Sequence, residues 1–258
     1  MIRFKSLGSG STGNATVVQA GGSGRLTHLL IDCGLGIRQL ETRLARAGLL
    51  AEQIDAIFIT HEHSDHVGCA RRLALRERIP VWMSHGTWTA MGKPDFEGLL
   101  RIACDEVEIP IGDLEVLPFT VPHDAREPLQ LTCGDGDRRL GLVTDLGHAT
   151  SHVLEQLAGC ATLLLECNHD PGLLAASTYP PFLKRRVAGD YGHLANAAAA
   201  ALAAALQPRG LRQVVAAHLS EQNNRPQLAR EALAGALGCS VADIHVADAA
   251  SGCGWLTA

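Results

Sequence analysis

The feature that most constrains this chain is the heptapeptide THEHSDH, residues 60–66, which directly follows the apolar run AIFI at 56–59. A short apolar run that contains β-branched residues predicts a buried strand, so the heptapeptide lies just beyond a strand's carboxyl end. Three histidines and one aspartate within six residues are unusual for a solvated loop, which is the plain alternative. The position and composition of the segment together favour a metal-binding site.

The spacing within the heptapeptide indicates more than one metal ion. In an extended loop, residues two apart project to the same side of the backbone, so His61 and His63 can meet at one point. Asp65 and His66 follow after a turn and can face a neighbouring point. Imidazole and carboxylate ligands suit zinc, manganese or iron rather than calcium. The segment therefore predicts ligands for two divalent transition-metal ions.

Three further candidate ligands stand where other apolar runs end. They are His123 within TVPHDA, Asp145 within VTDLG and His218 within AAHLS. Each of them alone could be a capping residue or a polar residue of the core. Because all three follow a predicted strand, as the heptapeptide does, we expect them to complete the site.

The order of the predicted elements indicates the fold class. We expect strands at 2–7, 15–20, 27–32, 56–59 and 81–83, a second series at 107–109, 114–119, 129–132 and 140–144, and later strands at 162–165 and 213–217. We expect helices at 37–47, at 67–76, from about residue 196, and at 226–237. Two strand-rich halves, each joined to helices, favour an α/β fold of the αββα sandwich type over a doubly wound sheet. No repeat or composition break divides the chain, so we expect one domain over residues 1–258.

Composition restricts the cellular setting. The eight cysteines include no CxxC pair, so we expect them to be small buried residues of a protein in a reducing cytosol. The N-terminus lacks the long apolar run of a secretion signal, and the Ala/Leu stretch at 195–206 is too short to cross a bilayer. We therefore expect a soluble, cytoplasmic protein with no membrane association.

Charge leaves the partner open. A net charge of −5 and a pI near 6.2 argue against a generally basic surface for nucleic acid. Lys184, Arg185 and Arg186 form a local basic run flanked by prolines and a glycine, which we expect on or near a loop. The run can contact a phosphate backbone or be an ordinary solvated surface.

The glycine-rich segment SGSTGN at 9–14 is a second candidate for substrate contact. Its two glycines and small side chains let backbone N–H groups approach phosphate oxygens, with Ser11 and Asn14 as the polar contacts. A plain β-turn is the alternative interpretation of the same residues.

The motifs THEHSDH, PHD, TD and HLS occur in the order of the ligand motifs of the metallo-β-lactamase superfamily, which this chain resembles. The resemblance implies one metal ion held by His61, His63 and His123, a second held by Asp65, His66 and His218, and Asp145 as the bridge between them. A centre of this kind generates hydroxide at neutral pH and stabilises an anionic transition state.

Further motifs narrow the resemblance. SGSTGN, LLIDCG at 29–34, ECNHD at 166–170, YPPFLKRRVAGDYGHLAN at 179–196 and HLSEQNN at 218–224 resemble the bacterial WalJ family, also called YycJ or VicX, over nearly the whole chain. The resemblance implies a compact nuclease that contains two zinc or manganese ions, with iron as a further option, and that degrades DNA from 5′ ends. One residue departs from the pattern, because GHLAN has Ala195 where serine is expected. A hydroxyl contact from that position is therefore in doubt.

A more distant resemblance is to the transfer-RNA 3′-processing endonucleases, whose glutamate and histidine pair corresponds to Glu166 and His193. It implies that Glu166 orients His193, which donates a proton to the departing oxygen. Metal-bound hydroxide would attack phosphorus, with Asp65 as both metal ligand and hydrogen-bond acceptor. A purely structural polar pair is the alternative for Glu166 and His193.

The leading hypothesis is a phosphodiesterase that acts on nucleic acid, DNA more than RNA, as an exonuclease. Its rival is a small-molecule hydrolase on the same metals, either a thioesterase of the glyoxalase II type or a cyclic-nucleotide phosphodiesterase. A binding module without activity is the third hypothesis, and it requires every catalytic candidate to be idle. The native metal, the cleavage polarity and the oligomeric state stay open at this stage.

Overall fold

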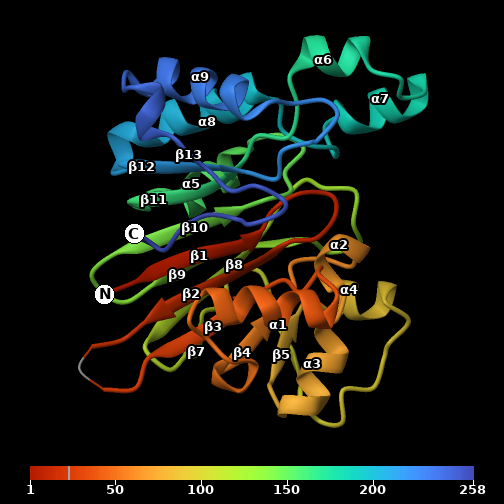
Figure 1. Cartoon of the computed structure of the whole chain (residues 1–258), viewed down its shortest axis with the longest axis vertical. Helices are drawn as coiled ribbons and strands as arrows, with labels where there is room; N and C mark the ends of the chain where they lie inside the picture. The colour runs from red at the N-terminus through yellow and green to blue at the C-terminus, as the bar shows by residue number, and fades with distance from the viewer. Residues whose placement is uncertain (23) are drawn as a thin grey trace.

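The computed structural model describes residues 1–22 and 24–258, which form two seven-stranded sheets packed face to face. The first sheet has the order β14 (Leu256–Thr257), β1 (Arg3–Gly8), β2 (Ala15–Ala20), β3 (Thr27–Ile31), β4 (Ala56–Phe58), β5 (Val81–Met83), β6 (Leu100–Ile102). The second has the order β13 (His245–Val246), β12 (Gln213–Ala217), β11 (Thr162–Glu166), β10 (Arg139–Val143), β9 (Leu129–Gly134), β8 (Leu114–Thr120), β7 (Ile109–Ile111). Helices cover both outer faces, so the predicted αββα sandwich is confirmed (Figure 1).

Both sheets combine an antiparallel part with a parallel part. In the first, β14, β1, β2 and β3 pair antiparallel, whereas β3, β4, β5 and β6 pair parallel. In the second, β7 to β10 pair antiparallel and β10 to β13 pair parallel. The carboxyl ends of neighbouring parallel strands meet at one edge of a sheet, which is where open α/β sheets place their ligands. This geometry brings the segments after β4, β10, β11 and β12 to one end of the sandwich.

Alternation of side chains explains why the strands are apolar throughout. In β11, Leu164 belongs to the core between the two sheets, while Leu163 and Leu165 pack against the helices outside. In β4, Phe58 points between the sheets and Ile57 toward the other helical layer. Because both faces of these strands are buried, their sequences lack the polar alternation of a half-exposed strand.

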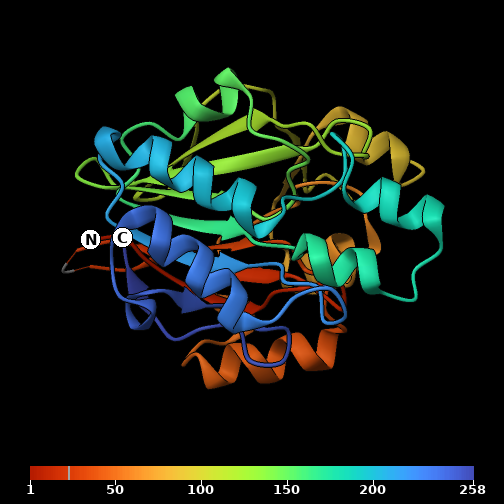
Figure 2. The ribbon, with the colours of Figure 1, turned by 90° about the horizontal axis from the view of Figure 1, so that it is seen from above.

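Long and short helices have different positions. The longer ones are α1 (Ile37–Arg46) and α3 (Ala70–Glu77) on the first sheet, and α8 (Asn196–Leu206) and α9 (Pro226–Leu237), with the shorter α5 (Ser151–Gln156), on the second. Short helices α2 (Ser64–Val67), α4 (His85–Ala90), α6 (Pro171–Ala176) and α7 (Pro181–Val187) gather at the end of the sandwich away from both termini (Figures 1 and 2). Single 3₁₀ turns are η1 (Ala51–Gln53), η2 (Gln207–Arg209) and η3 (Val241–Asp243). Across the described residues, no helix has the length and apolar character needed to cross a membrane.

The predicted helix at 67–76 is wrong in its boundaries, and the error affects the heptapeptide. Helix α2 begins at Ser64, so Asp65 and His66 are helical rather than beyond a turn in an extended loop. It ends at Gly68, whose φ of 31° breaks the helix before α3 starts at Ala70. A side chain at Gly68 would lie 2.3 Å from the Cys33 carbonyl oxygen, so the break depends on glycine.

Two smaller predictions were also wrong. The strand expected at 107–109 runs instead over Ile109–Ile111, because Glu106 has a left-handed φ of 56° and Val107 is an exposed turn residue. Among the cysteines, Cys104 and Cys239 are exposed, whereas the others are buried or half-buried, and all eight are free thiols.

Candidate functional site

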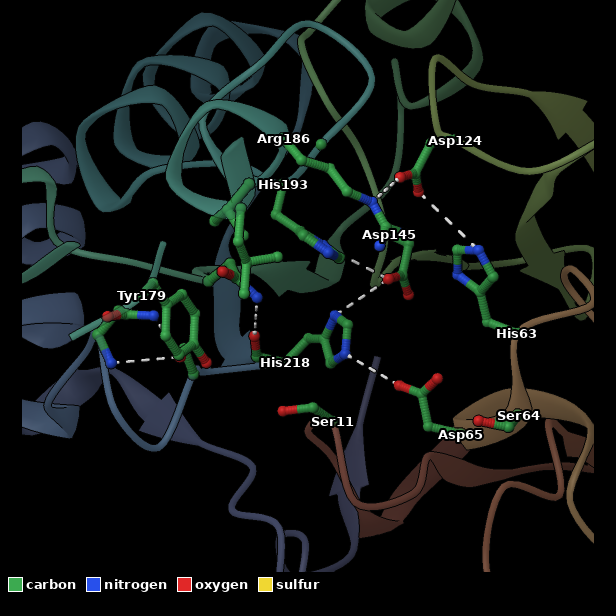
Figure 3. Close-up of a pocket in the computed structure, with 16 residues that line it drawn as sticks. Ser11, His63, Ser64, Asp65, Asp124, Asp145, Tyr179, Arg186, His193 and His218 are labelled. Carbon is green, nitrogen blue, oxygen red and sulfur yellow. Dashed lines mark hydrogen bonds and ion pairs between the residues drawn. The ribbon is translucent and has the colours of Figure 1, made fainter. Parts of the chain in front are cut away.

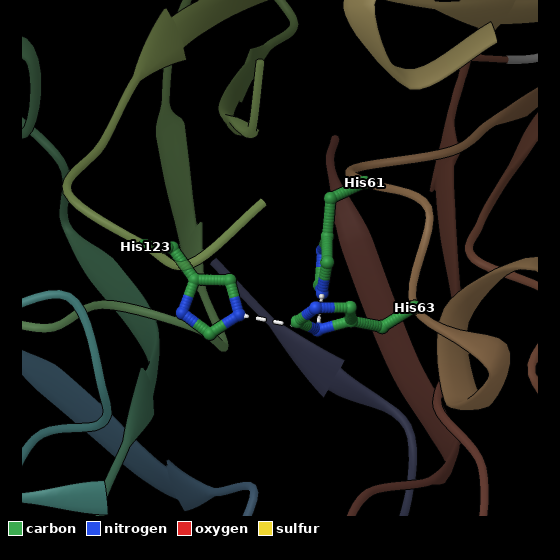
Figure 4. Close-up of side chains that lie close together, drawn as sticks. All are labelled: His61, His63 and His123. Carbon is green, nitrogen blue, oxygen red and sulfur yellow. Dashed lines mark hydrogen bonds between the residues drawn. The ribbon is translucent and has the colours of Figure 1, made fainter. Parts of the chain in front are cut away.

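The heptapeptide places its histidines around one point. His61 precedes α2 and His63 is the residue at its N-cap. His61 Nε2 lies 3.0 Å from His63 Nδ1, which is 3.4 Å from Nε2 of His123 in the segment after β8. Figure 4 shows the three rings converging from two separate parts of the chain. Their nitrogens form one group that is compact enough to hold an ion.

A second group adjoins the first, with Asp145 between them. Asp65 and His66 from α2 meet His218, which directly follows β12. The Asp145 carboxylate lies 3.2 Å from His66 Nε2, 3.2 Å from His218 Nδ1 and 3.8 Å from His123 Nε2. The structure thus brings all seven predicted ligands together, with Asp145 in reach of both groups.

Unpartnered atoms in this cluster fit bound metal ions. Asp145 Oδ2 and His218 Nε2 are buried and make no hydrogen bond within the described residues, and each faces another candidate ligand, His66 Nε2 at 3.2 Å and Asp65 Oδ2 at 3.7 Å. A buried polar atom left without a partner costs about 1–3 kcal/mol, so native proteins rarely contain two in one place without a ligand. Imidazole nitrogens and carboxylate oxygens are also the donors that zinc and manganese accept. The His/Asp clusters therefore fit a binuclear metal site.

The outer nitrogens of three histidines are held by fixed acceptors. His66 Nδ1 lies 2.8 Å from Asp32 Oδ2, and His123 Nδ1 lies 3.1 Å from the Gly192 carbonyl oxygen. His218 Nδ1 lies 3.2 Å from Glu166 Oε1. In each neutral ring, donation from Nδ1 to these acceptors leaves the lone pair on Nε2, which is the tautomer that a metal ligand needs.

Protonation differs across the cluster. Burial lowers the pKa of His61 well below its usual value and also lowers the pKa of His123. Burial opposes charge on His66 as well, but the Asp145 and Asp32 carboxylates outweigh it and raise the pKa of His66 to about 10. The pKa of His218 is likewise raised, with Asp145 as the main attractive charge. A metal ion that took a lone pair from His66 or His218 at neutral pH would have to displace a proton.

The segment SGSTGN supports the cluster more than it faces substrate. Ser9 Oγ accepts a hydrogen bond of 2.8 Å from the backbone N–H of His218, whose φ of 51° is unfavourable for a non-glycine residue. Asn14 is buried, and its Nδ2 lies 3.0 Å from His66 Nε2 and 3.3 Å from Asp65 Oδ2. A pocket opens in front of the cluster, and of the two predicted substrate contacts in this segment only Ser11 lines it. Asn14 is therefore better placed to position the candidate metal ligands than to bind substrate.

Two supporting residues were missed by the sequence interpretation. Asp32, at a left-handed φ of 59°, accepts hydrogen bonds from the backbone N–H and the hydroxyl of Thr60 in addition to contacting His66. Asp32 follows the apolar strand β3, as Asp145 follows β10, so the same pattern predicts a site residue at this position. Next to it, Gly34 is essential, since a Cβ there would lie 1.6 Å from the Asp65 carbonyl oxygen.

Glu166 and His193 form the predicted pair. Glu166 ends β11 and is fully buried, and its Oε1 lies 2.7 Å from His193 Nδ1. Its Oε2 accepts from the backbone N–H groups of Leu146 at 2.8 Å and Leu194 at 3.2 Å. The His193 side chain is 24% exposed and lines the pocket. Burial opposes its charged form, but the Glu166 carboxylate prevails and raises the pKa of His193.

The pocket in front of these groups has a volume of about 310 Å³ (Figure 3). Its wall comes from the heptapeptide, the strand ends and α7, and includes Ser11, Ser64, Asp124, Asn168, Tyr179, Leu183, Arg186, Val187, Ser220 and Asn223. Asp124, Tyr179 and Asn223 lie within the motifs PHD, YPPFLKRRVAGDYGHLAN and HLSEQNN, but the sequence analysis assigned none of them to the pocket.

The basic run is helical, which corrects the expectation of a loop. Lys184, Arg185 and Arg186 lie on α7, where Pro181 occupies the first helical position rather than ending a structured segment. Arg186 is the one lysine or arginine lining the pocket within the described chain, and its Nε donates to Asp124. Lys184 Nζ donates instead to the Ala175 carbonyl oxygen.

Residues of two further motifs form a buried amide pair that supports this end of the fold. Asn196 Nδ2 donates to Asn224 Oδ1 at 2.9 Å, and Asn224 Nδ2 donates to Asn196 Oδ1 at 2.8 Å. Asn224 Nδ2 also donates to the Cys167 carbonyl oxygen at 2.6 Å. The pair ties the start of α8 and the segment after His218 to the residue that follows Glu166.

Comparison with known proteins agrees with this geometry. The sequence model of the beta-lactamase superfamily domain matches residues 27–219. The solved metallo-β-lactamase-fold protein YhfI from Bacillus subtilis superposes with a TM-score of 0.76 at 15% identity, covering 99% of each chain. The fold and the His/Asp site together define a metal-dependent hydrolase of the metallo-β-lactamase superfamily.

Two relatives place the chain in a particular family within this superfamily. The chain is 34% identical to the exodeoxyribonuclease YycJ of Bacillus anthracis, over 89% of this chain and 86% of that protein. It is 29% identical to the exodeoxyribonuclease WalJ of Streptococcus pneumoniae, over 88% and 85% of the two chains. The chain belongs to the family of these proteins within the superfamily.

Proposed function

We propose that this protein is a binuclear metal-dependent phosphodiesterase that removes nucleotides from the ends of DNA. The observation that carries the proposal is the Glu166–His193 pair, which faces the same pocket as the two ligand groups. A metal site alone serves many hydrolases, whereas a charged, oriented imidazole beside it suits a reaction with a poor leaving group. The names of the relatives, both exodeoxyribonucleases, support DNA as the substrate.

The ligand groups define the hydrolytic centre. Two zinc or manganese ions, when bound there, supply a hydroxide at neutral pH and stabilise negative charge on the phosphate oxygens. Asp145 holds the groups together from between them, and Asp65 adds a second carboxylate at the pocket wall. Both carboxylates can also accept a hydrogen bond from a nucleophile and so direct its lone pair toward phosphorus.

His193 acts on the leaving group. Its Nδ1 is committed to Glu166, so Nε2 is the nitrogen available to the pocket. Two backbone N–H groups fix Glu166 in turn, which keeps the ring in one orientation. From there Nε2–H can protonate the sugar oxygen as its bond to phosphorus breaks.

Arg186 and Ser11 are the phosphate contacts at the pocket. Arg186 pairs with Asp124 in the free protein, and a phosphate of the substrate competes with that carboxylate for the guanidinium. Asp124 Oδ1 also lies 3.5 Å from His123 Nε2, so the same aspartate links substrate contact to the metal groups. Ser11, in the N-terminal segment SGSTGN, offers a hydroxyl at the pocket wall.

The test compares two substrates in one variant. His193→Ala should lower the rate of release of nucleotides from end-labelled DNA by at least about 10²-fold, the usual contribution of a general acid. Hydrolysis of bis(p-nitrophenyl) phosphate should be nearly unchanged, because nitrophenolate leaves without protonation. Glu166→Gln should show the same selectivity more weakly, and the metal content of both variants should equal that of the wild type.

Product ladders from single- and double-stranded DNA and RNA, with manganese- and zinc-loaded protein, give the substrate and the end attacked. The family resemblance implies attack from the 5′ end. Turnover of a thioester or a cyclic nucleotide without any nucleotide release from DNA would replace the proposal with the small-molecule hydrolase. Equal losses of rate on both substrates in His193→Ala would show that His193 does not protonate the leaving group.

A further inference from the structure

Exposed aromatic rings are concentrated beside the pocket. The chain has only five phenylalanines and two tyrosines, and Phe4, Phe58, Phe96 and Phe119 are core residues. The fifth phenylalanine and both tyrosines fall within residues 179–191, the segment that contains α7. Phe182 is 65% exposed and Tyr191 64% exposed, while Tyr179 lines the pocket. A cluster of exposed aromatic rings marks an interaction site, because the rings gain free energy when their apolar faces are covered. We therefore expect this segment to bind a ligand with apolar faces.

Positive charge accompanies these rings. Phe182 lies one turn before Arg186 on α7, and residues four apart share a side of a helix. Arg185 is exposed three residues after Phe182. Leu183, Arg186 and Val187 line the pocket, and Phe182 is an exposed neighbour of these residues on the same helix.

Tyr191 stands on a fixed backbone next to the catalytic groups. The carbonyl oxygen of Asp190 accepts from His148 Nδ1 at 2.8 Å, and that of Gly192 accepts from His123 Nδ1 at 3.1 Å. The N–H of Gly192 also donates to the Gly189 carbonyl oxygen at 2.8 Å, so the backbone on both sides of Tyr191 is anchored while its side chain is exposed. A ring with an ordered backbone loses little conformational entropy when it binds.

We propose, as a deepening of the proposed function, that residues 179–191 form a stacking platform for a single-stranded DNA end. Bases stack on Phe182 and Tyr191 while Arg185 and Arg186 neutralise phosphates, and Tyr179 contacts the base nearest the reacting phosphate. Single-stranded nucleic acid offers both an aromatic face and a negative backbone, which this combination matches. Figure 3 shows Tyr179 on the side of the pocket opposite His63, with Arg186 of α7 above the pocket.

Charge favours DNA over a second copy of the chain as the occupant. In a twofold contact the same patch meets itself, so the Lys184, Arg185 and Arg186 runs of two copies would be brought together. Like charges across an interface oppose association. The chain as a whole carries net negative charge, which repels a polyanion, so the basic run beside the pocket supplies a local attraction for a phosphate backbone.

The experiment separates stacking from charge. Metal-loaded protein is titrated into a fluorescein-labelled single-stranded oligonucleotide with phosphorothioate linkages, which slow cleavage, and into a matched oligonucleotide of abasic residues. Wild-type protein should bind the base-bearing strand about 100-fold tighter, the scale of two base–aromatic stacks of about tenfold each. Phe182→Ala and Tyr191→Ala should each weaken binding to that strand by about tenfold and leave the abasic strand unchanged, whereas Phe182→Trp should preserve the preference.

Two controls complete the design. Ile102→Ala removes a large exposed apolar side chain on β6 and should change neither affinity. Arg185→Ala should weaken both strands equally and reduce the logarithmic salt slope by about 0.7, as expected for one phosphate of a single strand.

The outcomes discriminate between the two proposals. Equal affinity of the wild type for base-bearing and abasic strands, or unchanged binding in both ring variants, overturns the platform. A dimer that Phe182→Ala dissociates in sedimentation, with DNA affinity unchanged, overturns it in favour of self-association. If the base preference is present but wild-type protein releases no nucleotides, the platform stands and the phosphodiesterase proposal fails.

Discussion

The two halves of the sandwich build the same site in opposite ways. The N-terminal half contributes four candidate ligands from residues 61–66, a single segment across the end of β4 and the start of α2. The C-terminal half contributes His123, Asp145, Glu166 and His218 one at a time, from the ends of β8, β10, β11 and β12. One half is compact in sequence, and the other is compact only in space.

The means of positioning differ accordingly. Asp145, Glu166 and His218 inherit their spacing from the parallel ladder of β10, β11 and β12, in which Glu166 of β11 is in register with Ala217 of β12. The heptapeptide starts at the end of one parallel strand, β4, but Asp65 and His66 lie on α2 and are supported by Asn14, Asp32 and Gly34 from other segments. A change at a strand end should therefore remove one side chain, whereas a change beneath the heptapeptide should displace several ligands together.

The largest expected effect is at Asp145, where a change at a strand end should disturb more than one side chain. Asp145 is a strand-end residue, yet it lies near ligands of both groups. We expect wild-type protein to contain about two transition-metal ions per chain, because seven ligands exceed one tetrahedral centre. Asp145→Ala should lower phosphodiester hydrolysis by at least about 10²-fold, comparable to loss of a group that stabilises transition-state charge. Elemental analysis should show less than two ions.

Folding should survive that change, and circular dichroism with a thermal melt of the metal-free proteins checks it. Asp137→Ala, in the exposed turn between β9 and β10, is the matched control and should keep full activity and metal. Full metal occupancy in Asp145→Ala would show that Asp145 does not link the two groups, and the halves would then act independently.

A change beneath the heptapeptide should have the next largest effect. Gly34→Ala places a methyl group against the Asp65 carbonyl oxygen, a backbone atom that cannot rotate away. Such overpacking typically costs about 1–3 kcal/mol of stability. The displaced α2 should also lower metal content, since Asp65 and His66 move with it.

Gly36→Ala is the control two residues along, because a Cβ at Gly36 meets nothing within 4 Å and its φ of −64° suits alanine. Urea unfolding and metal analysis of both variants make the comparison. Normal metal content in Gly34→Ala would mean that the heptapeptide holds its ligands without this support.

Much of this architecture could be predicted, and the reasons for success and failure are physical. Buried strands such as β4 and β11 are apolar on both faces, so their positions and the polar residues after them stand out in the sequence. Helix α7 could not be found this way, because a seven-residue helix without buried residues has no apolar periodicity. The flanking prolines were interpreted as loop signals, although proline also favours the first helical turn.

The site shows the same division. Every predicted metal ligand follows an apolar run, and Asp32 does too, although its supporting role was missed. Tyr179 and Asn223 also line the pocket, and although both lie in motifs of the family, no local pattern indicated that they face it. Local patterns identified the reacting groups, but the wall of the pocket depends on packing between distant segments.

The smallest expected effect concerns Ala195, the one departure from the family motif. Ala195 is the N-cap of α8, with φ −68° and ψ 154°, and no side chain caps the helix. The first backbone N–H groups of a helix lack intrahelical partners, and a serine hydroxyl at the N-cap accepts from one of them. Ala195→Ser should therefore stabilise the protein by about 1 kcal/mol, which raises the melting temperature by roughly 2–4 °C for a chain of this size.

Activity distinguishes a cap from a substrate contact at this position. Ala195 does not line the pocket, and Asn196 beside it is fixed by its amide pair with Asn224, so the new hydroxyl has the helix and not the substrate within reach. Ala197→Ser, an exposed position inside α8, is the control and should be neutral or slightly destabilising, because serine is a weaker helix former than alanine. A higher melting temperature with an unchanged rate on DNA supports the cap. A higher rate without added stability would instead place the hydroxyl at the substrate. Position 195 would then join His193 among the site residues of the C-terminal half.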